Sequence, residues 1–136
     1  MMQAVAGELK EKFGAGKPIV VGVTVLTSLD DHSLREVGVD SGMNAQVLRM
    51  AKLAESSGLD GVVCSPREIR MIRDAVNRDF KIVTPGIRMP GQPADDQQRT
   101  ATPHEAIADG ANYIVVGRGV THAPDPRGAL ESLLRT

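Results

Sequence analysis

The stretch "KIVTPG", residues 81–86, carries the pattern that decides the fold. It begins with an apolar, β-branched run and changes abruptly to Pro and Gly. Three similar runs occur in the chain, namely "PIVVGVTVL" (18–26), "GVVCS" (61–65) and "YIVVGR" (113–118). All four are continuously apolar rather than alternating, which is typical of parallel strands covered on both faces. The sequence therefore predicts four buried parallel strands.

Helical patterns separate the four runs. An amphipathic stretch covers residues 1–14, and further helices are predicted within 33–38, 40–61, 65–76, 102–111 and 125–134. The clearest helix start is at Thr102, which has capping-box spacing to Glu105 and is followed by Pro103. Gly110 is expected to end the same helix. Between Asp40 and Gly61, Asp40 or Ser41 is expected to cap the start and Gly58 the end.

One helix followed by four strand–helix units predicts an α/β fold over a single domain, residues 1–136. Two architectures fit this order. One is an open doubly wound parallel sheet. The other is half of a (β/α)8 barrel, since four strands are half of eight. In the second case the chain is an incomplete half-barrel domain.

Composition excludes several classes of function. The net charge is −1 with scattered basic residues, so nucleic-acid binding is not expected. No apolar stretch approaches the roughly 20 residues needed to span a membrane, and charges interrupt the N-terminal stretch, which does not resemble a signal peptide. Cys64 is the only cysteine, which excludes an internal disulfide and favours a reducing cytoplasm. His32, His104 and His122 lack metal-ligand spacing, so no metal site is predicted.

Polar groups follow three of the four strands. Thr27 and Ser28 follow the first, Pro85 and Arg88 follow the third, and "VVGRGVT" (115–121) follows the fourth. In "VVGRGVT" the glycines allow backbone N–H groups to approach an anion, and Arg118 supplies a forked cation. A short helix starting there would direct its positive end to the same anion. A glycine-rich turn with a solvated arginine is the alternative.

The loop 88–99 is longer than a simple connection requires, and Pro90, Gly91 and Pro93 oppose regular structure in it. We interpret it as a lid, with Gln97 available as a hydrogen-bonding group. A disordered surface loop is the alternative. Asp30 and Asp31 form a carboxylate pair, but capping of the helix at 33–38 explains them equally well.

Four segments together resemble the second half of orotidine 5′-phosphate decarboxylases. They are "VTVLTSLDD", "GLDGVVCSP", "IVTPGIRMPGQPADDQQR" and "YIVVGRGVT", which span most of the chain. The combination of "TPGIR…DQQR" with "VVGR" is more specific than either piece alone. The resemblance implies strands five to eight of a TIM barrel, preceded by one helix.

The resemblance also implies a function. The family is homodimeric and converts orotidine monophosphate to uridine monophosphate and CO2 in pyrimidine biosynthesis, with no cofactor or metal. Carried over by motif, Thr27 would lie at the base, and Arg88, Gln97, Gly117 and Arg118 would hold the phosphate. Ser28 and Pro85 would line the base and carboxylate side.

The family's catalytic motif, Asp-x-Lys-x-x-Asp, is the main departure. Its strand would precede Met1, and the only lookalike, "DFKIVT" (79–84), has Thr84 in place of the last Asp. Asp79 and Lys81 also start a strand, at the end of the barrel opposite the chemistry. We therefore expect this chain to be inactive alone and to pair with the missing half barrel or with a second copy. The alternative is a non-catalytic phosphate-binding half barrel.

Overall fold

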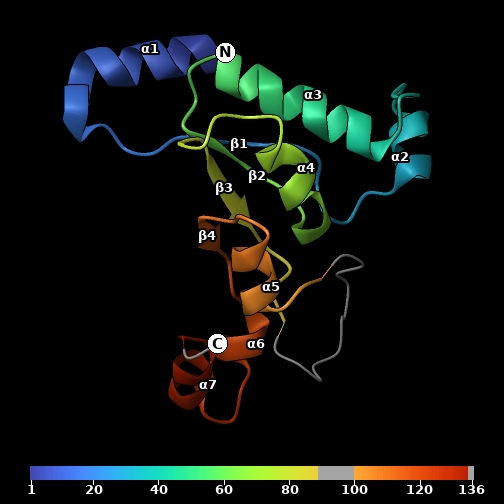
Figure 1. Cartoon of the computed structure of the whole chain (residues 1–136), viewed down its shortest axis with the longest axis vertical. Coiled ribbons are helices and arrows are strands. Elements are labelled where there is room, and N and C mark those ends of the chain that lie inside the picture. Colours follow the sequence, from blue (N-terminus) through green and yellow to red (C-terminus); the bar gives the residue numbers. More distant parts are fainter. Residues whose placement is uncertain (89–99, 135–136) are drawn as a thin grey trace.

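The computed structural model describes residues 1–88 and 100–134, and within them the strands form one parallel sheet. The strands are β1 (Val21–Val23), β2 (Gly61–Val63), β3 (Lys81–Thr84) and β4 (Tyr113–Ile114), and their order in the sheet is β1-β2-β3-β4 (Figure 1). Each strand pairs with the next one in sequence. A doubly wound sheet would reverse direction at a switch point, whereas a barrel adds its strands consecutively. The doubly wound alternative is therefore wrong.

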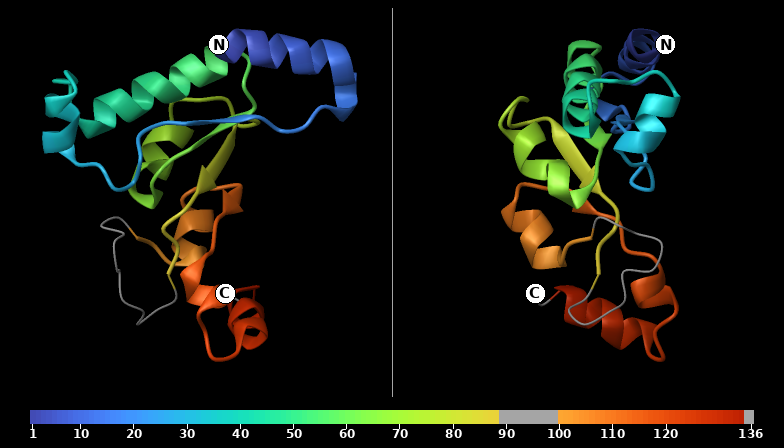
Figure 2. Two further views of the ribbon diagram at one scale, coloured as in Figure 1. Left: turned by 180° about the vertical axis from the view of Figure 1, so that it is seen from behind. Right: turned by 90° about the vertical axis from the view of Figure 1, so that its right-hand side faces the viewer.

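Helices were predicted in the correct places, whereas the strands are shorter than the apolar runs. The long helices are α1 (Met2–Phe13) and α3 (Met43–Ser56), and the shorter ones are α2 (Asp31–Glu36), α4 (Ile69–Arg73), α5 (Pro103–Ala108), α6 (Arg118–Thr121) and α7 (Pro126–Leu134). In residues 1–88 and 100–134, two 3-10 turns, η1 (Gly14–Gly16) and η2 (Pro66–Glu68), complete the elements. Helices α3, α4 and α5 lie on one side of the strands (Figure 2) and contact β2, β3 and β4, respectively.

The capping predictions are confirmed for α5 but wrong for the start of α3. Thr102 and Glu105 form a capping box, and the hydrogen bonds that Thr102 donates hold the pKa of Glu105 below its usual value. Helix α3 begins after Gly42 rather than at Asp40 or Ser41. A carboxylate oxygen of Asp31, on α2, accepts the backbone N–H of Met43 at 2.6 Å. The cap of α3 thus comes from the preceding helix, which local spacing does not reveal.

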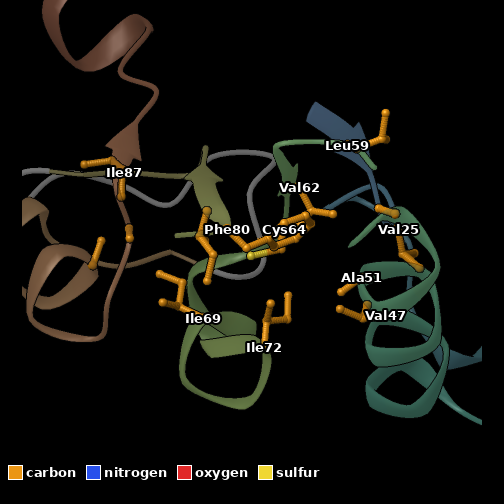
Figure 3. Close-up of a cluster of buried hydrophobic side chains, with 14 of the residues drawn as sticks. Val25, Val47, Ala51, Leu59, Val62, Cys64, Ile69, Ile72, Phe80 and Ile87 are labelled. Atoms are coloured by element: carbon orange, nitrogen blue, oxygen red, sulfur yellow. The ribbon is translucent and has the colours of Figure 1, made fainter. Parts of the chain in front are cut away.

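The core lies between the sheet and helices α3 and α4 (Figure 3). Val62 and Ile82, paired across β2 and β3, face this side and are at most 1% exposed. They pack with buried Val47 and Ala51 of α3 and with Ile72 of α4. These side chains are aliphatic, in keeping with a sequence in which only 2% of the residues are aromatic. Their burial provides the main stabilisation of the sheet.

The other face of the sheet is much more open. Val23 of β1 is 56% exposed, and Tyr113 and Val115, in and after β4, are each about half exposed. These positions alternate with less exposed ones, such as Thr24 after Val23 and Ile114 after Tyr113, as side chains on opposite faces of a strand must. The four runs are thus apolar on both faces, although the described residues bury only one of them. In the part of the chain described, none of the helices is long and apolar enough to cross a membrane.

An ion pair joins the segment before β1 to the start of β2. Asp60 accepts hydrogen bonds from the Lys17 ammonium group and from the Val20 backbone N–H, the latter at 2.8 Å. Partial burial raises the pKa of the Asp60 carboxyl, but these two donors outweigh it and lower the pKa below its usual value. The folded state therefore favours the charged carboxylate more than the unfolded chain does.

Asp60→Asn is expected to lower the free energy of unfolding at pH 7 by about 1 kcal/mol, because the charged acceptor is lost. A lowered folded-state pKa stabilises the protein above the unfolded-state pKa, and this stabilisation is lost as pH falls through the folded-state value. The difference between the wild type and the variant should therefore begin to shrink as pH falls below about 4. Urea unfolding between pH 7 and pH 3 measures this, with Asp79→Asn, at an exposed carboxylate, as control. A constant difference across that range would contradict it.

Candidate functional site

The candidate site lies at the carboxyl ends of the strands, where the predicted residues follow β1, β3 and β4. Thr27 and Ser28 occupy the two central positions of a turn closed by the Leu29 N–H and the Leu26 carbonyl at 3.0 Å. Thr27 is partly buried and Ser28 is exposed. This turn therefore presents both hydroxyl side chains beyond the end of β1. The structure separates them from the Arg88 segment by the intervening strand β2.

Arg88 follows β3 in a fixed stretch of backbone. Its N–H donates to the Ala101 carbonyl at 3.0 Å, and the Ala101 N–H donates to the Gly86 carbonyl at 3.3 Å. These bonds join the two ends of the long loop. Ile87, between Gly86 and Arg88, is 1% exposed. The Arg88 guanidinium donates to the Ile87 carbonyl at 3.0 Å. Gln97 lies outside the described residues, as do all lid positions from 89 to 99.

Gly117 and Arg118 form the start of helix α6, after β4. Gly117 is the N-cap residue, and its carbonyl accepts the N–H groups of Val120 and Thr121. Arg118 is the exposed first residue of the helix. The prediction of a short helix beginning at this point is confirmed. A Cβ atom added at Gly117 would meet no atom of the described residues within 4 Å, so the backbone there is open to a close approach.

The order of the sheet brings the two cationic segments to neighbouring strand ends. β3 pairs directly with β4, and the pairing continues past β4, where the Val115 N–H donates to the Thr84 carbonyl at 2.8 Å. Pro85 and Arg88 therefore follow the strand beside the one that leads to Gly117 and Arg118. Backbone N–H groups at a helix start with arginines on two adjacent loops make a suitable environment for a phosphate.

Other candidates have structural roles. Asp30 caps α2 by accepting the N–H and the hydroxyl of Ser33, and these bonds lower the pKa of Asp30. With Asp31 capping α3, capping explains the carboxylate pair. All three histidines are exposed, and within residues 1–88 and 100–134 no cluster of three or more His, Cys, Asp or Glu side chains could hold a metal. Cys64 is buried and is not part of a disulfide.

The lookalike "DFKIVT" is at the wrong end of the sheet, as expected. Lys81 is the first residue of β3, and Asp79 precedes it. Both line an open hollow of about 370 Å³ at the amino ends of the strands, together with Asp60 and Glu55. Asp60 is engaged with Lys17, and Glu55 accepts the backbone N–H of Asn77 at 2.7 Å. This hollow therefore does not assemble a catalytic lysine–aspartate motif.

Comparison with known protein families identifies the family to which the chain belongs. Residues 1–133 match the model described as "Orotidine 5′-phosphate decarboxylase / HUMPS family". The chain belongs to this family. The match covers the ends of β1, β3 and β4, which build the candidate site.

Comparisons with individual proteins support the same family assignment. The chain is 50% identical over 137 residues to the orotidine 5′-phosphate decarboxylase of Moorella thermoacetica, covering 98% of this chain and 54% of the relative. It is 45% identical over 132 residues to that of Glaesserella parasuis, covering 97% of this chain and 57% of the relative. A crystal structure of the Lactobacillus acidophilus orotidine 5′-phosphate decarboxylase superposes with a TM-score of 0.82 at 40% identity, covering 99% of this chain and 57% of that one.

The chain corresponds to only part of each of these relatives. The chain spans a little over half the length of the curated relatives it matches. The fold is therefore about half of the family's TIM barrel, with four consecutive parallel strands and their helices. The half-open face of the sheet, with Val23 and Tyr113, is the face that points into the interior of such a barrel.

Sequence reasoning missed buried polar side chains beside the site. Thr84, Ser65 and Glu68 are each at most 2% exposed at the carboxyl ends of β3 and β2. Glu68 accepts the Ser65 N–H at 2.9 Å, and Thr84 donates to the Cys64 carbonyl at 2.9 Å. The Ser-x-x-Glu spacing in "SPRE" is a capping-box signal that could have identified Glu68. The importance of Thr84 depends on its neighbour Pro85, which has no N–H to donate.

Proposed function

We propose that this chain is the part of an orotidine 5′-phosphate decarboxylase that binds the phosphate and the base. The observation that carries the proposal is the pairing of β3 with β4, which puts the Arg88 and Gly117–Arg118 segments at neighbouring strand ends. Arg88, Gln97, Gly117 and Arg118 would hold the phosphate, and Thr27 would contact the base. Ser28 and Pro85 would line the base and carboxylate side.

The proposed reaction is loss of CO2 from orotidine monophosphate to give uridine monophosphate. This chain's contribution is binding at a distance from the reacting carbon, and such binding energy can be used to orient and distort the substrate. The 136 residues contain no Asp-x-Lys-x-x-Asp, so the lysine that would protonate the carbanion must come from another segment. Alone, the chain is expected not to turn over substrate. Cys64, which is buried and not part of a disulfide, fits a cytoplasmic location.

The partner in this proposal is the remaining part of the barrel. The half-exposed apolar face with Val23, Tyr113 and Val115 supports such a partner, because strands of a complete barrel would cover it. A homodimer of complete barrels, as in the family, would follow from that assembly. The competing function is a phosphate-binding half barrel without catalysis, which the missing motif favours.

Mixing this chain with a separately produced segment that carries strands one to four and Asp-x-Lys-x-x-Asp tests the decarboxylase proposal. Turnover is followed by the fall in orotate absorbance. We expect turnover on mixing and none from either piece alone. Association of the two folded pieces without turnover would refute the proposal and favour the non-catalytic phosphate-binding module.

Arg118→Ala is expected to weaken binding of uridine monophosphate to this chain roughly tenfold or more, because a charge-assisted bond to the phosphate is lost. Titration calorimetry of the isolated chain measures the change. Arg127→Ala is the matched control, since this exposed arginine on α7 pairs with Glu131 at 2.9 Å. Equal affinities of the two variants would exclude Arg118 from the phosphate site.

A further inference from the structure

The ladder between β2 and β3 is interrupted beside the candidate site. The Lys81 N–H donates to the Asp60 carbonyl at 2.8 Å, and in a parallel ladder every second residue of a strand donates to the same neighbour. Continuing this spacing along β3 brings residue 85 opposite the carbonyl of Cys64. Residue 85 is proline and has no N–H to donate. The next bond of the ladder therefore cannot form from the backbone.

The hydroxyl of Thr84 replaces the missing donor. It donates to the Cys64 carbonyl at 2.9 Å, with a longer contact of 3.3 Å to the carbonyl of Pro85. Thr84 is 0% exposed and Cys64 is 1% exposed, so water is not available to satisfy this carbonyl. On its other side, the Thr84 carbonyl accepts the Val115 N–H. Thr84 thus joins the end of β3 to the strands on both sides.

The segment that begins at Thr84 is constrained up to Arg88. Pro85 has a restricted φ, and Gly86 has a φ of +77°, a left-handed conformation that favours glycine. Ile87 is buried, and Arg88 is bonded through its N–H to Ala101. The stretch is therefore held at its start by the Thr84 hydroxyl and at its end by the bond to Ala101.

We propose that Thr84 is a positioning residue for Arg88, and that its hydroxyl compensates for the donor that Pro85 removes. Proline stiffens the turn that presents the arginine, while threonine keeps that turn attached to the central strand β2. The inference rests on the proposed function, because it assigns Arg88 to an anion. Thr84 itself need not contact the ligand.

Three variants separate the hydroxyl from the shape of the side chain. Thr84→Val keeps the shape but removes the donor, Thr84→Ser keeps the donor, and Thr84→Val with Pro85→Ala restores a backbone N–H at position 85. Thr84→Val is expected to weaken uridine monophosphate binding about fivefold, and Thr84→Ser by less than about twofold. The double variant should return to the affinity of Pro85→Ala alone. Circular dichroism verifies folding of each variant.

A double-mutant cycle with Arg88→Ala distinguishes positioning from a general loss of stability. If Thr84 acts through Arg88, Thr84→Val should change the affinity by less than about twofold in the Arg88→Ala background. A folded Thr84→Val variant with wild-type affinity would overturn the inference. If the Thr84→Val variant folds only when Pro85→Ala is also present, the affinity of this double variant decides. An affinity equal to that of the Pro85→Ala variant supports the inference. An affinity as low as that of the Arg88→Ala variant overturns it. Failure of the wild type to bind would instead reject the proposed function.

Discussion

Gly61→Ala is expected to destabilise the folded chain by about 3 kcal/mol, because the added methyl group has no space. An ideal Cβ at Gly61 would lie 2.2 Å from the carbonyl oxygen of Lys81 and 2.8 Å from its carbonyl carbon. Both are backbone atoms of the paired strand β3, so no side-chain rotation can relieve the clash. The strands must separate, which weakens the central pair of the sheet. Urea unfolding monitored by circular dichroism measures the loss.

Gly7→Ala is the matched control for this substitution. Gly7 is exposed within helix α1, and a Cβ added there meets no described atom within 4 Å. Alanine favours a helix over glycine by about 1 kcal/mol, so this variant should be slightly more stable than the wild type. The same Gly→Ala change is thus expected to lower the free energy of unfolding at position 61 and to raise it at position 7. Similar stabilities of the two variants would show that β2 and β3 are not paired in this register.

Arg73→Met is expected to lower the free energy of unfolding by about 2 kcal/mol, because several carbonyl groups lose a charged donor. The Arg73 guanidinium, at the end of α4, donates to the Phe80 carbonyl at 2.8 Å and to the Gly110 carbonyl at 3.0 Å. It also donates to the side-chain oxygen of Asn112 at 2.8 Å. This one side chain therefore joins α4 to the segments that lead into β3 and β4. Methionine keeps the apolar stem and removes only the donors.

Arg70→Met, one turn earlier on α4, is the control. Arg70 pairs with Asp109 at 2.6 Å, but its side chain is 75% exposed. Exposed ion pairs of this kind contribute less than about 1 kcal/mol. Chemical denaturation of both variants should therefore rank Arg73→Met well below Arg70→Met in stability. A larger loss at Arg70 would contradict the bridging role assigned to Arg73.

The fold was largely predictable because its signals are local. Continuous β-branched runs marked the four strands, and the spacing of Thr102 and Glu105 marked the start of α5. The order of strands in the sheet was not determined by these runs, since both parallel architectures share them. The resemblance to a barrel family supplied the order. The predicted strands were too long because apolar residues continue beyond the last hydrogen bond of the ladder, as in "VVGVTVL" around β1.

Contacts between residues far apart in the sequence could not be predicted from local sequence patterns. The carboxylate of Asp31 caps α3 from another helix, and the guanidinium of Arg73 reaches segments more than 30 residues away. Neither partner can be identified from spacing, because the tertiary fold determines which atoms meet. The predicted site residues Thr27, Arg88, Gly117 and Arg118 were correctly placed at strand ends. Their roles in binding stay a prediction, and Gln97 lies outside the described residues.

The consecutive order of the strands has a consequence for how the chain acquires its structure. Gly61 pairs with Lys81 only 20 residues away, whereas Val21 pairs with Gly61 across 40 residues and Val83 with Tyr113 across 30. Closing a shorter segment loses less conformational entropy. The β2–α4–β3 unit is therefore the least costly place for folding to begin. From this centre the sheet can grow outward in both directions, with each new strand added to an edge that is already formed.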